Sequence, residues 1–291
     1  MTTEQTSAAG RALVLGGGGL SGVAWETGIL AGLAAGGADV TAADYVLGTS
    51  AGATVTAQIG SGLPITDLFD RQTVPALQSA ELAPDLSRVI ELMESWEKLP
   101  LEFPDPAELR RVVGQRALAA ETVPEAERRA VIAGRLPQHA WPSRKVAVVA
   151  VEAHTGDVRV FDQDSGADLV DAVTASCAIP GIWPPVSIGG GRYIDGGTRS
   201  VVNADLAAGY QRVLILAPMA DPSLDEQVAG LVAAGEQVQV QVITPDDEST
   251  AAIGLNPLDP AVRAPVARAG YAQGERSAAA VARLWQGPDF P

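Results

Sequence analysis

Five consecutive residues, Gly48-Thr49-Ser50-Ala51-Gly52, fit the pattern G-x-S-x-G. In this pattern a strand turns sharply into a helix, and glycines two positions before and after the serine leave room for both elements. The turn projects the serine hydroxyl above the sheet and points the N–H of Ala51 toward a developing oxyanion. An apolar run precedes the motif and a run of small residues follows it. The sequence therefore predicts a nucleophile at Ser50 rather than a serine that only caps a helix.

A second glycine-rich turn, GGGGLSG at residues 16–22, also follows a strand-like run and precedes a helical one. Through Gly17, Gly19 and Gly22 it satisfies G-x-G-x-x-G, the fingerprint of dinucleotide-binding proteins. Backbone N–H groups at a helix N-terminus bind either a pyrophosphate or a tetrahedral oxyanion. The loop alone thus leaves open a nucleotide-binding oxidoreductase, and the independent serine turn favours an oxyanion hole.

A serine nucleophile needs a base, and neither histidine suits that role. His139 lies in a proline-broken loop, and His154, the last histidine of the chain, precedes a Thr-Gly turn. Ordinary α/β hydrolases place the histidine after the acid. A carboxylate can replace it when desolvated and close. Asp195, followed by Gly196-Gly197, is the candidate, although an isolated Asp-Gly-Gly also fits a turn without chemistry.

These motifs stand at the ends of alternating strand and helix patterns. Strand-like runs occupy residues 11–15, 45–48, 145–151, 158–161, 192–194, 212–217 and 237–243, and helical runs occupy 23–35, 53–59, 168–177 and 260–285. Repeated strand, glycine turn and helix predict an α/β fold with a mostly parallel sheet. We expect one domain over residues 11–291, with a flexible N-terminus at 1–10.

The segment from 64 to 142 has a different character. Prolines divide it into short amphipathic stretches, including 86–99 and 106–120, with Asp105 as the expected N-cap of the second. We expect a helical insertion packed beside or over the sheet. Its role is either that of a lid or that of a plain helical layer.

Composition excludes several classes of function. A net charge of −15 argues against nucleic acid as a partner and against strong docking on anionic lipids. The one cysteine, Cys177, permits no internal disulfide, and with two histidines it makes a zinc site improbable. The N-terminus lacks a signal-peptide pattern, and no apolar run has membrane-spanning length. We therefore expect a cytoplasmic protein.

Taken together, GGGGLSG at 16–22, GTSAG at 48–52 and DGG at 195–197 resemble the patatin-like phospholipase family. A fourth stretch is similar to the family's A-S-x-A-x-P block and the P-P-V that follows it, at residues 175–180 and 184–186. The resemblance covers the chain from about Arg11 to Leu216. It implies a three-layer α/β/α sandwich and a Ser-Asp dyad that needs no metal or organic cofactor.

The resemblance also implies a role for each site residue. Ser50 would be the nucleophile and Asp195 the base. The N–H groups of Gly17, Gly18 and Gly19 would form the oxyanion hole together with that of Ala51. The implied activity is hydrolysis of lipid-like carboxylic esters, with transient contact to a membrane surface.

One position departs from the family pattern. Many members carry Arg or Lys in the glycine loop where this chain has Ser21. Without that fixed charge, a neutral acyl ester or a lysolipid fits the site as well as a diacyl phospholipid. A non-catalytic lipid-binding protein on the same fold is a further alternative, because a motif fixes neither pKa nor geometry.

Overall fold

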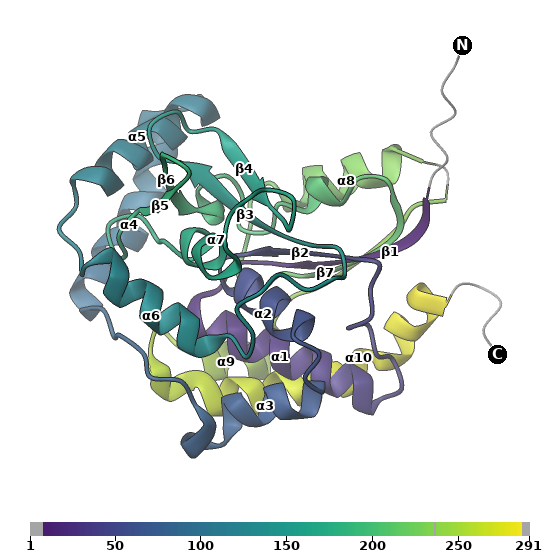
Figure 1. The fold of residues 1–291 in the computed structure, drawn as a ribbon. Coiled ribbons are helices and arrows are strands. Elements are labelled where there is room, and N and C mark those ends of the chain that lie inside the picture. Colours follow the sequence, from purple (N-terminus) through teal and green to yellow (C-terminus); the bar gives the residue numbers. More distant parts are fainter. Residues whose placement is uncertain (1–7, 236, 287–291) are drawn as a thin grey trace, which may run out of the picture.

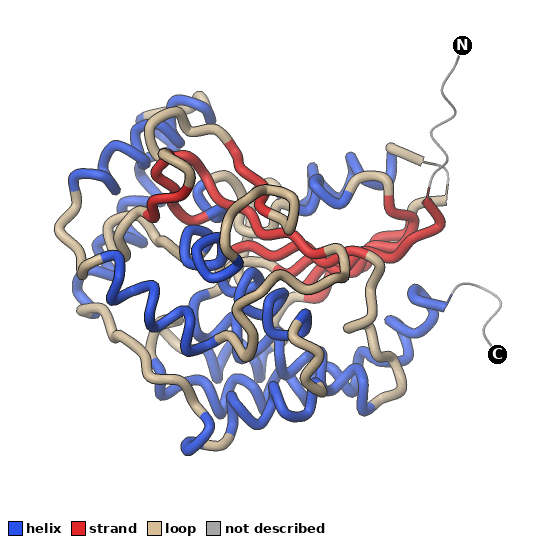
Figure 2. Tube along the Cα trace, viewed as in Figure 1, coloured by secondary structure: helices blue, strands red, loops and turns tan. Residues whose placement is uncertain are grey.

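Eight strands form one sheet in the computed structural model, which describes residues 8–235 and 237–286 (Figures 1 and 2). The strand order is β5-β6-β3-β2-β1-β7-β8, with β4 also paired to β3. Strands β3, β2, β1, β7 and β8 are mutually parallel, whereas β4, β5 and β6 pair antiparallel. The strands are β1 Ala8–Leu15, β2 Tyr45–Thr49, β3 Val146–Glu152, β4 Val158–Phe161, β5 Val186–Ile188, β6 Gly191–Asp195, β7 Tyr210–Leu216 and β8 Gln239–Ile243.

Helices cover both faces of the sheet. They are α1 Gly19–Ala35, α2 Ala51–Gly60, α3 Ile65–Thr73, α4 Leu86–Glu102, α5 Pro106–Ala119, α6 Glu125–Arg135, α7 Leu169–Ser176, α8 Leu224–Ala233, α9 Asp247–Ile253 and α10 Arg263–Gln286. Figure 1 shows α1, α2, α3 and α10 below the sheet and α8 above it. The fold is therefore a three-layer α/β/α sandwich, as predicted from the sequence.

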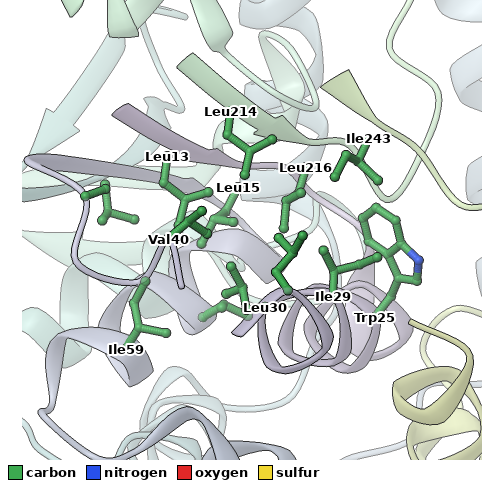
Figure 3. Packing of buried hydrophobic residues seen from close by; sticks show 14 of the residues in the cluster. Leu13, Leu15, Trp25, Ile29, Leu30, Val40, Ile59, Leu214, Leu216 and Ile243 are labelled. Carbon is green, nitrogen blue, oxygen red and sulfur yellow. The ribbon is translucent and has the colours of Figure 1, made fainter. Parts of the chain in front are cut away.

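Alternation along the central strands explains the two outer layers. Leu13 and Leu15 of β1 point to one face, where they pack with α1 side chains such as Trp25 and Ile29 (Figure 3). Val14 points to the other face and packs in a cluster that includes Leu231 of α8. Because strands buried on both faces need apolar side chains throughout, these runs are continuously hydrophobic.

Helices α1 and α10 approach each other unusually closely. A Cβ at Gly28 would lie 2.2 Å from the carbonyl oxygen of Ala267, and one at Gly32 would lie 2.0 Å from that of Tyr271. Glycine is thus required at both contacts. The close packing buries α1 and thereby fixes the glycine turn at its N-terminus.

The segment 64–142 contains four α-helices, α3 to α6, and its described residues form no strand. The expected helices appear as α4 and α5, and the Asp105 carboxylate caps α5 by accepting from the N–H groups of Ala107 and Glu108 at 2.8 and 2.9 Å. Helix α6 packs through Ile132 against the same face of the sheet as α7. Strand β5 and helix α9 are additions that sequence periodicity did not indicate.

Within the described part of the chain, the helices are all too short or too polar to cross a membrane.

Candidate active site

Ser50 lies in the turn between β2 and α2, with a φ of 53° that non-glycine residues rarely adopt. The flanking glycines permit this turn. A Cβ at Gly48 would lie 2.4 Å from the carbonyl oxygen of Gly52, and one at Gly52 would lie 2.0 Å from that of Leu15. Both positions therefore exclude any side chain, which is the physical basis of the G-x-S-x-G spacing.

Two residues at the end of α7 hold the strained backbone of Ser50. The N–H of Ser50 donates to Ser176 Oγ at 2.9 Å, and that hydroxyl donates to the carbonyl oxygen of Val149 at 2.6 Å. The thiol of Cys177 donates to the carbonyl oxygen of Ser50 at 3.0 Å. Ser176 and Cys177 belong to the A-S-x-A-x-P stretch at residues 175–180. This stretch thus supplies side chains that stabilise the serine turn.

Asp195 ends β6 and is 5% exposed. Its Oδ1 accepts from the N–H of Gly197 at 2.7 Å, and its own N–H donates to the carbonyl oxygen of Ala178 at 3.0 Å. Its Oδ2 has no hydrogen-bond partner among the described residues. One carboxylate oxygen is thus anchored and the other is free to accept a proton.

Burial raises the pKa of Asp195 to about 7. The hydroxyl of Ser50, the N–H of Gly197 and the charge of Arg128 oppose that rise. Ser50 and Asp195 line the same cavity, and Asp195 Oδ2 forms no hydrogen bond of ordinary geometry with the serine hydroxyl. Such contacts in enzymes without ligand often tighten only when substrate binds.

Asn203 connects the two halves of the site and was not anticipated from the sequence. Its φ is 55°, and its side-chain amide donates to Thr49 Oγ1 at 3.1 Å, to the carbonyl oxygen of Gly196 at 3.3 Å and to that of Ser200 at 2.6 Å. Thr49 precedes Ser50 and Gly196 follows Asp195. The amide thus fixes the serine turn relative to the aspartate turn, and no spacing rule could have identified it.

The glycine loop lies against the serine turn, since the N–H of Gly52 donates to the carbonyl oxygen of Gly16 at 2.9 Å. Of the four N–H groups expected to form the oxyanion hole, the prediction for Gly17 is wrong. The N–H of Gly17 donates to the carbonyl oxygen of Val201 at 2.8 Å and is not free for a substrate. The N–H groups of Gly18, Gly19 and Ala51 have no acceptor in the part of the chain that the structure describes.

Two cavities border Ser50 and share Gly19, Ser50, Ile179 and Leu258. The larger spans about 690 Å³, a volume that includes space open to solvent, and is also lined by Gly17, Gly18, Val89, Leu92, Pro180, Asp195, Gly197, Thr198, Val201, Met219 and Pro257. The smaller spans about 330 Å³, a volume that includes space open to solvent, and is also lined by Leu20, Ala51, Leu82, Arg128, Arg135, Cys177 and Trp183. The first is mostly apolar, and the second contains two arginines.

His139 and His154 are exposed and line neither cavity, as their sequence context predicted. Within residues 8–235 and 237–286, no group of three or more His, Cys, Asp or Glu side chains is arranged to hold a metal ion.

Comparisons with known proteins bear on the family. A family model described as patatin-like phospholipase matches residues 13–208, which include Ser50, Asp195 and the glycine loop. A comparison with curated proteins finds no match.

Two solved structures are similar to this chain. The crystal structure of VipD from Legionella pneumophila is 15% identical with a TM-score of 0.47, over 94% of this chain and 67% of that one. The crystal structure of the type III effector protein ExoU is 14% identical with a TM-score of 0.40, over 92% of this chain and 53% of that one. This chain therefore spans about half of the ExoU chain.

Proposed function

The chain belongs to the patatin-like phospholipase family, and from this premise we propose that it is a serine acyl hydrolase that cleaves carboxylic esters of lipids with a Ser50–Asp195 dyad. The observation that supports the dyad most is the position of the Ser50 hydroxyl beside a buried carboxyl with a pKa of about 7. A base with that pKa is ionised in part at neutral pH and accepts a proton readily.

The proposed reaction has two steps. Ser50 Oγ attacks the ester carbonyl carbon and gives its proton to Asp195 Oδ2, and the developing oxyanion accepts hydrogen bonds from the N–H groups of Gly18, Gly19 and Ala51. The C–O bond to the alcohol breaks, and the proton on Asp195 passes to the departing alcohol oxygen. Asp195 then takes a proton from water, whose oxygen attacks the acyl-Ser50 ester. As the bond from the acyl carbon to Ser50 Oγ breaks, this proton passes from Asp195 to Oγ, which releases the carboxylic acid and restores both residues.

The larger cavity suits the acyl chain. Its lining includes the apolar side chains of Val89, Leu92, Ile179, Val201 and Leu258, and it reaches both Ser50 and Asp195. An apolar chain that enters it leaves water, which stabilises the complex by about 0.8 kcal/mol for each buried methylene.

The test is hydrolysis of p-nitrophenyl esters of graded chain length, with EDTA present, by the wild type, Ser50→Ala and Asp195→Asn. We expect turnover by the wild type and a loss of about 10³-fold or more in Ser50→Ala, because the substitution removes the hydroxyl that would form the acyl-enzyme. Asp164→Asn, which changes an exposed aspartate, is the matched control and retains full activity.

Full activity in Ser50→Ala would eliminate the proposed nucleophile. If the wild type were inert on these esters and on phospholipids, the lipid-binding alternative would replace the hydrolase. Circular dichroism of each variant checks that a loss of activity does not reflect unfolding.

A further inference from the structure

Arg128 is a buried cation close to Ser50, and it forms no ion pair with a carboxylate of the described residues. It lies on α6, is 3% exposed and lines the smaller cavity together with Ser50 and Ala51. Its Nε and Nη1 atoms have no hydrogen-bond partner, and it forms no ion pair with any described residue. A guanidinium group in such a position loses its hydration without compensation, which is costly.

Trp183 lines the same cavity and offers a further unused donor. Its ring centroid is 4.0 Å from the guanidinium carbon of Arg128, so the ring supports the cation. The indole is 4% exposed, and its Nε1 has no partner within the described chain. Buried donors without acceptors are uncommon in native proteins and therefore point to a ligand that supplies the acceptors.

The charges around the smaller cavity do not balance. Arg135, on the same helix, forms two hydrogen bonds to the Glu81 carboxylate at 2.9 and 2.6 Å, and Arg263 lies 3.9 Å from one oxygen of that carboxylate. Glu81 is thus fully occupied and leaves Arg128 unpaired. Burial lowers the pKa of Arg128 to about 9, so that the group is still charged near neutral pH. The nearby carboxyl of Asp195 also attracts Arg128, but even when it is ionised the arginines outnumber the carboxylates by one, so excess positive charge remains at the smaller cavity.

We propose that Arg128 and Trp183 form a subsite for an anionic oxygen group, a lipid phosphate, on a ligand seated at Ser50. The two cavities meet at Ser50, so a lipid with its acyl chain in the apolar cavity extends its alcohol portion into the smaller one. A phosphate on that portion accepts from the guanidinium and indole donors. The inference rests on the proposed function in that the ligand is the substrate.

The position of this charge in the sequence is informative. The glycine loop carries Ser21, which is neutral and whose hydroxyl donates to the carbonyl oxygen of Gly18 at 2.9 Å. The cation near Ser50 comes instead from the helical segment 64–142, through Arg128. This segment would then determine which lipids are accepted.

Binding to Ser50→Ala protein, in which the nucleophile is absent, tests the subsite without any need for turnover. The probes share one chain: octyl phosphate, octanoate and the uncharged ether 1-O-octylglycerol, each titrated by calorimetry. We expect octyl phosphate to bind most tightly. Adding Arg128→Met should weaken it about 10- to 100-fold, as for loss of hydrogen bonds to a charged group, and leave the ether unchanged.

The matched control is Arg129→Met, which removes the next arginine of α6, one that pairs with Asp171 outside both cavities. It should leave the affinity for octyl phosphate unchanged. Equal affinity of the three probes, or an Arg128→Met protein that keeps the preference, would overturn the subsite. Tightest binding of octanoate would assign the charge to the released acid and overturn the phosphate assignment.

A kinetic comparison separates substrate binding from an effect on Asp195, whose carboxyl Arg128 also influences. With Ser50 intact, Arg128→Met should lower kcat/KM for lysophosphatidylcholine about 10- to 100-fold and spare a monoacylglycerol with the same acyl chain. Equal losses on both, with a shifted pH profile, would make Arg128 a positioning residue for Asp195 and contradict the proposal.

A second variant keeps the subsite testable if Arg128→Met does not fold. Trp183→Phe keeps the ring and removes only the Nε1 donor, and it should weaken octyl phosphate about 2- to 10-fold without affecting the ether. If no ester is hydrolysed but octyl phosphate still binds through Arg128, the hydrolase proposal fails and the subsite stands. Hydrolysis without any preference for a charged substrate would instead support the hydrolase and overturn the subsite.

Discussion

Two groups of residues meet at Ser50, and they differ in how their polar groups are used. On the strand-end side lie Gly18, Gly19, Ala51 and Asp195, in turns that follow the sheet strands. The turns fix the backbone of these residues. The three N–H groups and one carboxylate oxygen, Asp195 Oδ2, have no hydrogen-bond partner among the described residues. These free N–H donors and this free carboxylate oxygen are the groups that hydrolysis of an ester requires.

On the helix side lie Glu81, Arg128 and Arg135, in the segment 64–142. Arg128 and Arg135 are one heptad apart on α6, and both are buried, yet only Arg135 has a carboxylate partner. A buried arginine is therefore a candidate for ligand binding only when, like Arg128, it lacks a carboxylate partner. Glu81 and Arg135 contribute to stability, whereas Arg128 is a cost to the empty protein that a ligand can offset.

Apart from Ser50→Ala, Asp195→Asn should have the largest effect on activity of the substitutions on the strand-end side. The variant should lose about 10²- to 10⁴-fold in kcat, because the amide cannot accept the proton of Ser50. In the wild type, kcat should rise with pH through an apparent pKa of about 7, as the carboxylate forms. Measurement of kcat from pH 5 to pH 9 checks both, and a flat wild-type profile would contradict the assigned base.

The same variant, although it loses activity, should be at least as stable as the wild type above pH 7. The pKa of Asp195 is raised by folding from 3.8 to about 7, so the folded state binds a proton that the unfolded state has released over that interval. The resulting stabilisation is complete below pH 4 and is lost as the pH rises through 7. Asp195→Asn should therefore melt at or above the wild-type temperature at pH 8; a clear decrease would show that the carboxylate is structural.

The next effect in size concerns the helix side. Glu81→Gln removes the charge that Arg135 and Arg263 share, and leaves both cations buried without a carboxylate. We expect the free energy of unfolding to fall by about 3–5 kcal/mol, as measured by denaturant titration. Glu91→Gln, which changes an exposed residue of α4, is the matched control and should change it little. If the two variants were equally stable, the claim that Glu81 stabilises Arg135 while Arg128 has no such partner would be contradicted.

A smaller effect tests the steric argument for the serine turn. Gly52→Ala places a methyl group against the backbone of Leu15 and should lower the free energy of unfolding by about 3 kcal/mol. Gly134→Ala, in the last turn of α6 with nothing within 4 Å of the added Cβ, should raise it by up to about 0.5 kcal/mol through helix propensity. The two melting curves should shift in opposite directions, and parallel shifts would refute the close approach.

Much of the strand-end side could be predicted because its determinants are local. The spacing of Gly48, Ser50 and Gly52 implies one kind of turn, and the structure shows a strand ending at Thr49 and a helix beginning at Ala51. The apolar runs predicted strands close to their observed bounds for the same reason, except that β1 begins at Ala8, inside the stretch expected to be a flexible N-terminus. Periodicity and glycine sterics act over a few residues and can be recognised from those residues alone.

The pairing of polar groups could not be predicted in this way. No local pattern indicates that Val201 takes the N–H of Gly17, that Asn203 connects the two turns, or that Glu81 pairs with Arg135 and not with Arg128. Hydrogen-bond partners, burial and the resulting pKa values depend on segments far apart in the chain. Local sterics and periodicity in the amino-acid sequence thus specified the fold and its serine turn, whereas packing between distant segments determined where unpaired charge remains.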